Sequence, residues 1–211
     1  NTIEYNYPRE VKLGKGFMRG GKLVEEPFDF SRQNYMSLED MQLMLQSVLF
    51  PLSVPESRRF NISEEHRQFL LQYMSQYASE TNYPKYNAEK FFDSYAKFFF
   101  RPQPMPEQLR VFNKTGWAYG FLTDVSYVAD FKNNIEYMLS ATVYVNSDGI
   151  LNDGKYDYND IGYPFLYELG QAIYEHEKKR KRKKANLQEF KLQYETRNPS
   201  DKRPVITDVD N

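Results

Sequence analysis

The sequence predicts an α+β domain in which an antiparallel sheet is covered by a C-terminal helix and preceded by a helical subdomain. Apolar residues recur with helical spacing through residues 37–80, follow strand-like patterns from residue 109, and return to helical spacing after Pro164. The 211 residues suffice to bury a sizeable core. Four segments follow from these patterns: an irregular loop region (1–35), a helical subdomain (36–105), a region of strands, hairpin and C-terminal helix (106–184), and a flexible tail (185–211).

The first 35 residues contain the glycines and prolines that typically interrupt regular structure. Two glycine clusters, at 14–16 and 20–21, match neither a Walker loop nor a dinucleotide fingerprint, and no apolar strand precedes them. We therefore expect an irregular segment here, without a phosphate-binding site.

Helical patterns follow in three stretches. Ser37 precedes an apolar stripe that ends at Pro51, and Ser63 precedes a second stripe whose first turn is acidic. Serine is a favoured N-cap, and acidic residues in the first turn suit the helix dipole. Aromatic residues in these stretches are expected to pack in the core. The sequence predicts helices over 37–50, 63–80 and 88–99.

Strand patterns replace the helical ones after these stretches. Residues 109–114 form the first predicted strand, while 120–131 and 135–145 form a hairpin whose turn is the polar segment 132–134. Pro164 then stands where a helix can begin. The apolar stripe of that final helix is expected to pack on the sheet.

Seven consecutive basic residues, 178–184, follow the final helix. Adjacent like charges repel, and no base-reading pattern accompanies them, so we interpret the run as a solvated extension of the helix. Nucleic-acid attachment, a nuclear address and contact with an anionic membrane surface are the alternatives. The formal net charge of −1 argues against a generally basic nucleic-acid-binding protein.

The composition excludes several kinds of site. Without cysteine, the chain has no disulfide, no Cys-ligated zinc or iron–sulfur centre, and no thiol nucleophile. Neither His66 nor His176 has further ligands at metal spacing, and the acidic loop 148–160 lacks the EF-hand pattern, so we expect no metal and no other cofactor. No apolar run is long enough for a transmembrane segment.

The segment Lys114-Thr115-Gly116, followed by Trp117, is the one pattern with recognisable chemistry. It resembles a motif of serine β-lactamases and penicillin-binding proteins, and this resemblance implies the roles that follow. On an exposed strand edge, Lys114 would hold a substrate carboxylate and Thr115 would donate a hydrogen bond to it. Gly116 has no side chain, so a substrate could lie against the backbone. The backbone N–H of Trp117 would serve as an oxyanion-hole donor.

This motif and its surroundings resemble the closing part of class A β-lactamase-like proteins, particularly bacterial serine hydrolases of the β-lactamase and penicillin-binding-protein superfamily. In that family a strand bearing Lys-Thr-Gly is followed by a hairpin and a long C-terminal helix. The similar stretches are 112–120, 137–146, 149–153 and 161–166, and the helices at 37–50 and 63–80 fall in the family's order. The resemblance implies a β-lactamase/transpeptidase-like sheet, a small-molecule or peptide substrate with a carboxylate, and a periplasmic or extracellular location.

The family also requires groups that this chain does not supply at the expected positions. A Ser-x-x-Lys pair should lie well upstream of Lys-Thr-Gly, yet the match from Ser94 to Lys97 comes shortly before the motif, and we interpret it as helix surface. The triplet 144–146 matches the family's Tyr-x-Asn in letters but follows the motif. Glu25 and Glu26 lie near the position of the deacylating glutamate without its spacing.

We therefore expect an incomplete domain: a C-terminal half whose nucleophile half precedes Asn1. The leading hypothesis is part of a serine acyl hydrolase that forms an acyl-enzyme on amide or ester substrates, inactive as this chain alone. The expected partners are the substrate and the missing N-terminal half, with no specific nucleic acid. A non-catalytic binding or scaffold module of the same fold is the alternative, favoured by the bulk of Trp117 beside the glycine. A nucleic-acid protein using the basic run is a third possibility.

Overall fold

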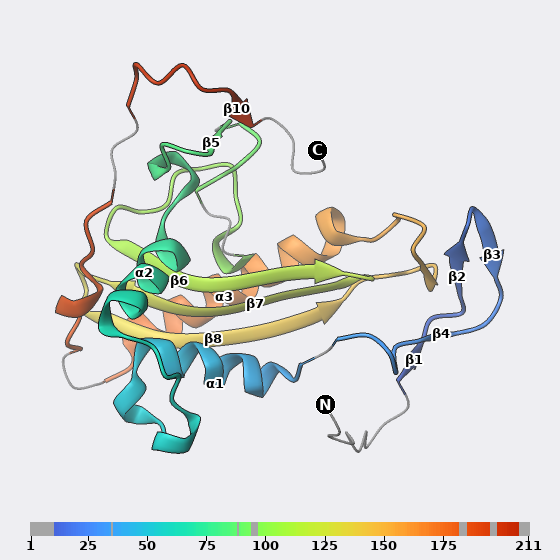
Figure 1. Ribbon diagram of the computed structural model, residues 1–211, viewed down its shortest axis with the longest axis horizontal. Coiled ribbons are helices and arrows are strands. Elements are labelled where there is room, and N and C mark those ends of the chain that lie inside the picture. Colours follow the sequence, from blue (N-terminus) through green and yellow to red (C-terminus); the bar gives the residue numbers. More distant parts are fainter. Residues whose placement is uncertain are drawn as a thin grey trace.

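The structure is a computed structural model, and it describes residues 11–34, 36–87, 89–93, 97–181, 185–194 and 198–206. Its centre is an antiparallel sheet with the strand order β6 (Leu109–Ala118), β7 (Phe121–Asp130) and β8 (Ile135–Tyr144). Figure 1 shows the three strands side by side, with the C-terminal helix α3 (Tyr163–Lys179) behind them. The predicted α+β class, hairpin and final helix are confirmed.

Both connections in the sheet are tight turns. Tyr119 and Gly120, between β6 and β7, have φ values of 55° and 87°, as a two-residue hairpin turn requires. After β7, the Asp130 carboxylate accepts hydrogen bonds from the backbone N–H groups of Lys132 and Asn133. The first strand was predicted to end at residue 114. In the structure it runs to residue 118 because pairing with β7 continues through the whole motif to this turn.

Two apolar layers cover the two faces of the sheet. Successive side chains of a strand point to opposite faces, so both layers draw on the same strands. One face packs against α3, and the other packs against α1 (Leu38–Leu49) and α2 (Glu64–Ser75). The first core includes Leu109, Val111, Leu122, Val128 and Leu166; the second includes Leu45, Leu71, Phe112, Val125 and Tyr127.

The first two predicted helices form with the expected caps. The Ser37 hydroxyl accepts the backbone N–H of Asp40, and the Ser63 hydroxyl accepts that of His66. α2 ends at Ser75 instead of near residue 80. There the chain becomes extended, and the Tyr77 hydroxyl donates to the carbonyl of Leu109 in β6, a contact that a continuing helix would not make.

The third predicted helix, 88–99, is absent from the described part of that range except for the single turn η4 (Lys97–Phe99). Of its described aromatic residues, Phe91, Phe98 and Phe99 are buried, as expected. The backbone of Phe98 lies so close to α3 that a Cβ atom at Gly170 would stand 2.2 Å from the Phe98 carbonyl oxygen. A glycine in α3 therefore allows η4 to seat directly on the helix.

Lys97 is fully buried, so its interpretation as helix surface was wrong. Its backbone N–H donates to an Asp124 carboxylate oxygen at 2.6 Å, and Asp124 also accepts from the Asn113 carboxamide. The Lys97 ammonium lies 4.7 Å from the ring centre of Trp117 and 4.9 Å from that of Tyr163. Burial lowers the pKa of Lys97 to about 8 and raises the pKa of Asp124 to about 6.

The N-terminal region contains strands where the sequence predicted irregular loops. β2 (Gly16–Arg19) and β3 (Lys22–Val24) form a hairpin across Gly20–Gly21, whose positive φ values suit a tight turn. β2 also pairs in parallel with β9 (Ile150–Leu151). This pairing joins segments far apart in the chain, so no local pattern indicates it.

The segment after the basic run packs on the sheet, although the sequence predicted a flexible tail there. Leu187 and Phe190 are buried in the core beside α1 and α2, and the Tyr194 hydroxyl hydrogen-bonds that of Ser75 at 2.7 Å. Farther on, β10 (Val205–Ile206) pairs with β5 (Lys85–Tyr86). The apolar residues of this segment are spaced too irregularly to predict an element. Leu187 and Phe190 nevertheless complete the core beside α1 and α2.

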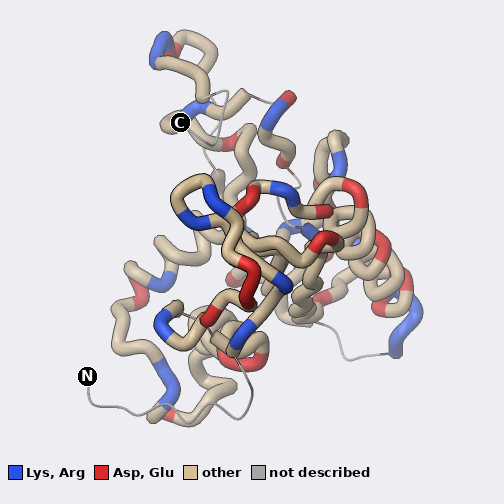
Figure 2. Tube along the Cα trace, turned by 90° about the vertical axis from the view of Figure 1, so that its right-hand side faces the viewer, with Lys and Arg blue, Asp and Glu red and all other residues tan. Residues whose placement is uncertain are grey.

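Residues 178–181 of the basic run are exposed, and 182–184 lie outside the described residues. Two of these cations pair within α3 and its end: Lys178 with Glu175 and Arg180 with Glu177, each at 2.8 Å. Figure 2 shows positive and negative residues interspersed along the trace. Within the described residues, no helix is long and apolar enough to span a membrane.

The remaining elements are short. They are β1 (Lys12–Leu13), which pairs with β4 (Phe28–Asp29), and the helical turns η1 (Pro51–Ser53), η2 (Glu56–Arg58), η3 (Ala78–Glu80), η5 (Tyr158–Gly162) and η6 (Gln188–Phe190).

Replacing Gly170 with alanine should destabilise the fold, because the new methyl group would collide with the backbone of Phe98. Overpacking of this kind costs about 1–3 kcal/mol in free energy of unfolding. Urea denaturation measures the loss. Glu168→Ala, at an exposed position of α3, serves as the control and should change little. Equal stability of Gly170→Ala and wild type would contradict the close approach.

The buried amine of Lys97 should make the unfolding free energy rise with pH from about pH 8 toward 10. In this range the folded chain has released the Lys97 proton, whereas the unfolded chain, with the ordinary pKa near 10.5, retains it. The rise should approach about 1.4 kcal/mol per pH unit. Urea denaturation between about pH 7.5 and 9 measures it, at least one pH unit below the ordinary tyrosine pKa near 10.

Lys97→Met, which keeps an apolar stem without the titrating amine, should lack this rise. Lys132→Met, at an exposed turn position, should retain it. The buried environment of Lys97 would be disproved by equal pH dependence in wild type and Lys97→Met.

Candidate functional site

A cavity of about 710 Å³ lies along the final part of β6, on the face of the sheet that α1 covers. All four residues predicted for the site, Lys114, Thr115, Gly116 and Trp117, line it. The opposite side comes from α1 and from the segment that leads into it. The other lining residues are Phe30, Gln33, Asn34, Met36, Leu38, Met41, Ala118, Tyr119, Phe121, Thr123 and Thr142.

Lys114 belongs to the face of β6 that looks toward α1, as does Phe112 two residues earlier. Its side chain is exposed, and the ammonium donates to the backbone carbonyl of Thr115 at 2.7 Å. A positive charge thus stands at the border of a cavity whose lining is mostly uncharged. An anionic group of a ligand would find its counter-charge there.

The Thr115 hydroxyl donates to the backbone carbonyl of Thr123 at 3.0 Å. The predicted hydrogen bond to a substrate carboxylate therefore requires the hydroxyl to exchange this internal partner. Gly116 differs, because a Cβ atom placed on it would meet nothing within 4 Å. Packing within the described chain does not demand a glycine here, and the space beside the backbone is open.

Trp117 is 44% exposed and borders the cavity. The Lys97 ammonium stands against its ring, and the attraction between cation and ring orients the indole. Sequence reasoning missed this role of Lys97. The one available signal was the cluster of aromatic residues around 98–100, which contains Phe100, another ring near the ammonium.

β6 is an edge strand in the part of the chain that the structure describes, since its recorded partner there is β7. An edge strand offers backbone N–H and C=O groups to another extended segment or to a ligand. The motif thus lies where a substrate could align with the strand, as the predicted chemistry requires.

The other positions considered from the sequence do not join this cavity. Ser94 lies outside the described residues, and no serine is among the described residues that line the cavity. Glu26 borders a different cavity beside Arg19. Asn146 has a local structural role, because its carboxamide donates to the Ile150 carbonyl.

The histidines and acidic loop likewise make local contacts. His66 and His176 are exposed, and the described residues contain no group of three or more His, Asp or Glu side chains that could hold a metal. In the loop, Asp148 accepts the backbone N–H of Ile150, and Asp157 accepts that of Ser147. Asp148 therefore stabilises a turn, and Asp157 links the two ends of the loop.

Comparison with family models matches residues 10–176 to the model described as the beta-lactamase enzyme family. No curated protein and no solved structure gives a significant match. The matched range contains α1, α2, the motif strand, the hairpin and most of α3. The α+β architecture described above agrees with this result. Because the model covers most of the sequence, the chain belongs to the beta-lactamase enzyme family.

Proposed function

We propose that this chain forms the substrate-carboxylate side of a serine acyl hydrolase that acts on amides or esters through an acyl-enzyme. Membership of the beta-lactamase family supports a serine-hydrolase type of function in general. The observation that carries the finer proposal is that Lys114, Thr115 and Gly116 line one cavity at an edge strand. This arrangement suits a carboxylate-bearing substrate lying along the strand.

The roles follow from the chemistry of each group. Lys114 provides a positive charge that attracts the substrate carboxylate, and Thr115 adds a hydroxyl donor. The open space at Gly116 lets the substrate approach the backbone. The N–H of Trp117 then stabilises negative charge on the acyl oxygen in the transition state.

The nucleophilic serine and its base are proposed to come from polypeptide other than these 211 residues. No serine is among the described residues that line the cavity, and this supports a nucleophile from outside these residues. The reaction would form an ester between that serine and the acyl group, release the amine or alcohol, and end with attack by water.

The 211-residue chain by itself should give no covalent adduct with a fluorescent penicillin or a fluorophosphonate. The protein extended by its upstream coding sequence should be labelled at a serine within the added segment. Gel fluorescence and mass spectrometry of the adduct check both statements. Labelling of the 211-residue chain would refute the proposal that the nucleophilic serine lies outside it. Ser94→Ala would then be the next variant to measure.

In the extended protein, Lys114→Ala should slow acylation by about tenfold or more, because a charge-assisted contact to the substrate carboxylate is lost. Stopped-flow or quenched labelling measures the acylation rate constant. Lys132→Ala removes an exposed lysine outside the cavity and should leave the rate unchanged. Wild-type acylation in Lys114→Ala would refute the assigned role.

A non-catalytic binding module is the second candidate. Two observations favour it: the exposed ring of Trp117 occupies part of the cavity border, and the Thr115 hydroxyl is engaged internally. This candidate predicts no covalent adduct even in the extended protein, with non-covalent binding of a carboxylate ligand that Lys114→Ala weakens. The labelling experiment thus separates the two functions.

A further inference from the structure

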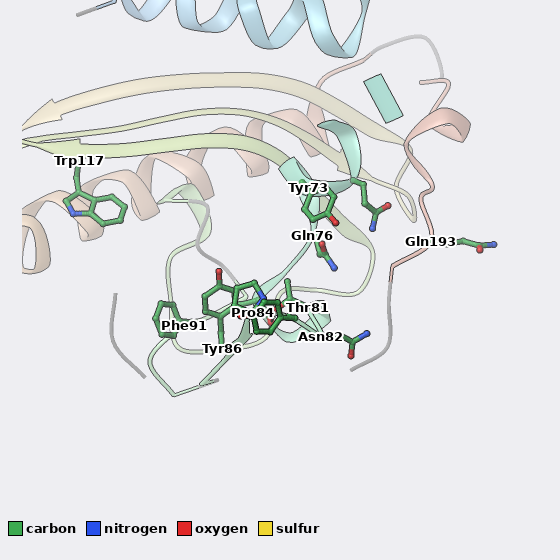
Figure 3. Close-up of a pocket in the computed structure, with 12 residues that line it drawn as sticks. Tyr73, Gln76, Thr81, Asn82, Pro84, Tyr86, Phe91, Trp117 and Gln193 are labelled. Carbon is green, nitrogen blue, oxygen red and sulfur yellow. Dashed lines mark hydrogen bonds between the residues drawn. The ribbon is translucent and has the colours of Figure 1, made fainter. Parts of the chain in front are cut away.

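A second cavity, of about 730 Å³, is also bordered by Trp117. Its other sides come from the C-terminal end of α2, from residues 78–86, from Phe91 and from the segment that contains Gln193. Figure 3 shows Trp117 at one end, Tyr86 and Phe91 together on another side, and Tyr73 and Gln76 at the end of α2. This volume is within the ~300–1,000 Å³ range of small-molecule sites.

The lining of this cavity contains no charged side chain among the described residues. Five of its twelve residues are aromatic and four carry carboxamides. The aromatic residues are Tyr73, Tyr83, Tyr86, Phe91 and Trp117, and the carboxamides are Gln72, Gln76, Asn82 and Gln193. The cations that contact its rings, Lys97 at Trp117 and Arg203 at Tyr83, are not among the lining residues. A charged ligand would lose its hydration without touching a charged side chain of the lining.

Several of the rings are accessible to a ligand. Tyr73 is 64% exposed and Trp117 is 44% exposed, whereas Tyr86 and Phe91 form a pair with ring centres 5.0 Å apart. Apolar surface left in contact with water is costly, and a cluster of it indicates a binding surface. The cavity thus combines accessible aromatic rings with a packed aromatic side.

The carboxamides add hydrogen-bonding capacity between the rings. Gln76 is oriented by a hydrogen bond from its side-chain nitrogen to the Glu80 carbonyl at 3.1 Å. A carboxamide contains both donors and acceptors, which matches a hydroxyl group that donates and accepts. A purely hydrocarbon ligand would deprive these amides of water without replacing the hydrogen bonds.

We propose that this cavity binds a short neutral oligosaccharide, with the apolar C–H faces of the sugar rings on the aromatic side chains and the hydroxyls on the carboxamides. The proposal is independent of the acyl-hydrolase function, because it uses neither Lys114 nor a nucleophile. Tyr73 and Gln76 are the side chains expected to contribute most, since Tyr73 is exposed and the Gln76 carboxamide is oriented.

Trp117 is the sole tryptophan of the sequence and borders both cavities, so its fluorescence reports a ligand in either one, and the Tyr73 and Gln76 variants assign the response to this cavity. The full 211-residue chain is titrated with chitotriose, cellotriose and maltotriose, and with trigalacturonate and a polyproline peptide for comparison. At least one neutral trisaccharide should change the Trp117 emission saturably at millimolar or lower concentration. Isothermal calorimetry should give the same dissociation constant.

Tyr73→Ala or Gln76→Ala should weaken that binding about five- to tenfold, as expected for loss of one aromatic or hydrogen-bonding contact. The matched controls are Phe165→Ala, an exposed ring on α3, and Gln68→Ala, another glutamine of α2, neither of which lines the cavity. Both should bind like wild type.

Three results would overturn the proposal. The first is the absence of a saturable response to any of the three neutral sugars, and the second is sugar binding that neither Tyr73→Ala nor Gln76→Ala weakens. The third is a response confined to trigalacturonate or polyproline, which would identify an acidic glycan or a peptide as the ligand. Because the assay contains no acylating reagent, none of these results bears on the proposed hydrolase function.

Discussion

The central sheet carries apolar side chains on both faces, and the rest of the fold is arranged to cover them. Phe112 and Val111 are neighbours in β6, yet each is buried in a different core. One face is closed by α3 and η4, and the other by α1, α2 and residues 185–194. Without any one of these segments, a strand would expose large apolar side chains to water.

This two-sided burial explains which elements the sequence could predict. α1, α2, α3 and the hairpin repeat apolar residues with a regular period, and serine caps or turn residues set their ends. The segment containing Leu187 and Phe190 has no such period, so its place in the core depends on contacts with strands far away in the chain. The pairing of β2 with β9 could not be predicted for the same reason, since the two strands lie far apart in the chain.

In the candidate site, too, some residues could be predicted from the sequence and others could not. Lys114, Thr115 and Gly116 were identified because three adjacent residues form a motif, and they line one cavity. The opposite side, including Gln33 and Met36, comes from a segment with no pattern of its own. Its place beside β6 follows from the packing of α1, which no motif in that segment specifies.

Lys97 was misjudged because its position relative to the sheet depends on tertiary structure. A lysine next to phenylalanines gives no sign in the sequence of whether it faces solvent or the interior. The seating of η4 on α3 decides this, and it places the ammonium beneath Trp117 and the backbone beside Asp124. Lys97 and Asp124, both titratable, thereby help to hold the motif strand β6 in place.

The missing side chain at Gly170 consequently links α3 to the cavity beside the motif strand. A bulkier residue there would displace Phe98, and Lys97 is attached directly to it in the chain. That shift would move a cation away from the underside of the indole at the cavity border. The orientation of the indole at the cavity border thus depends on the spacing between two backbones at a position that does not line the cavity.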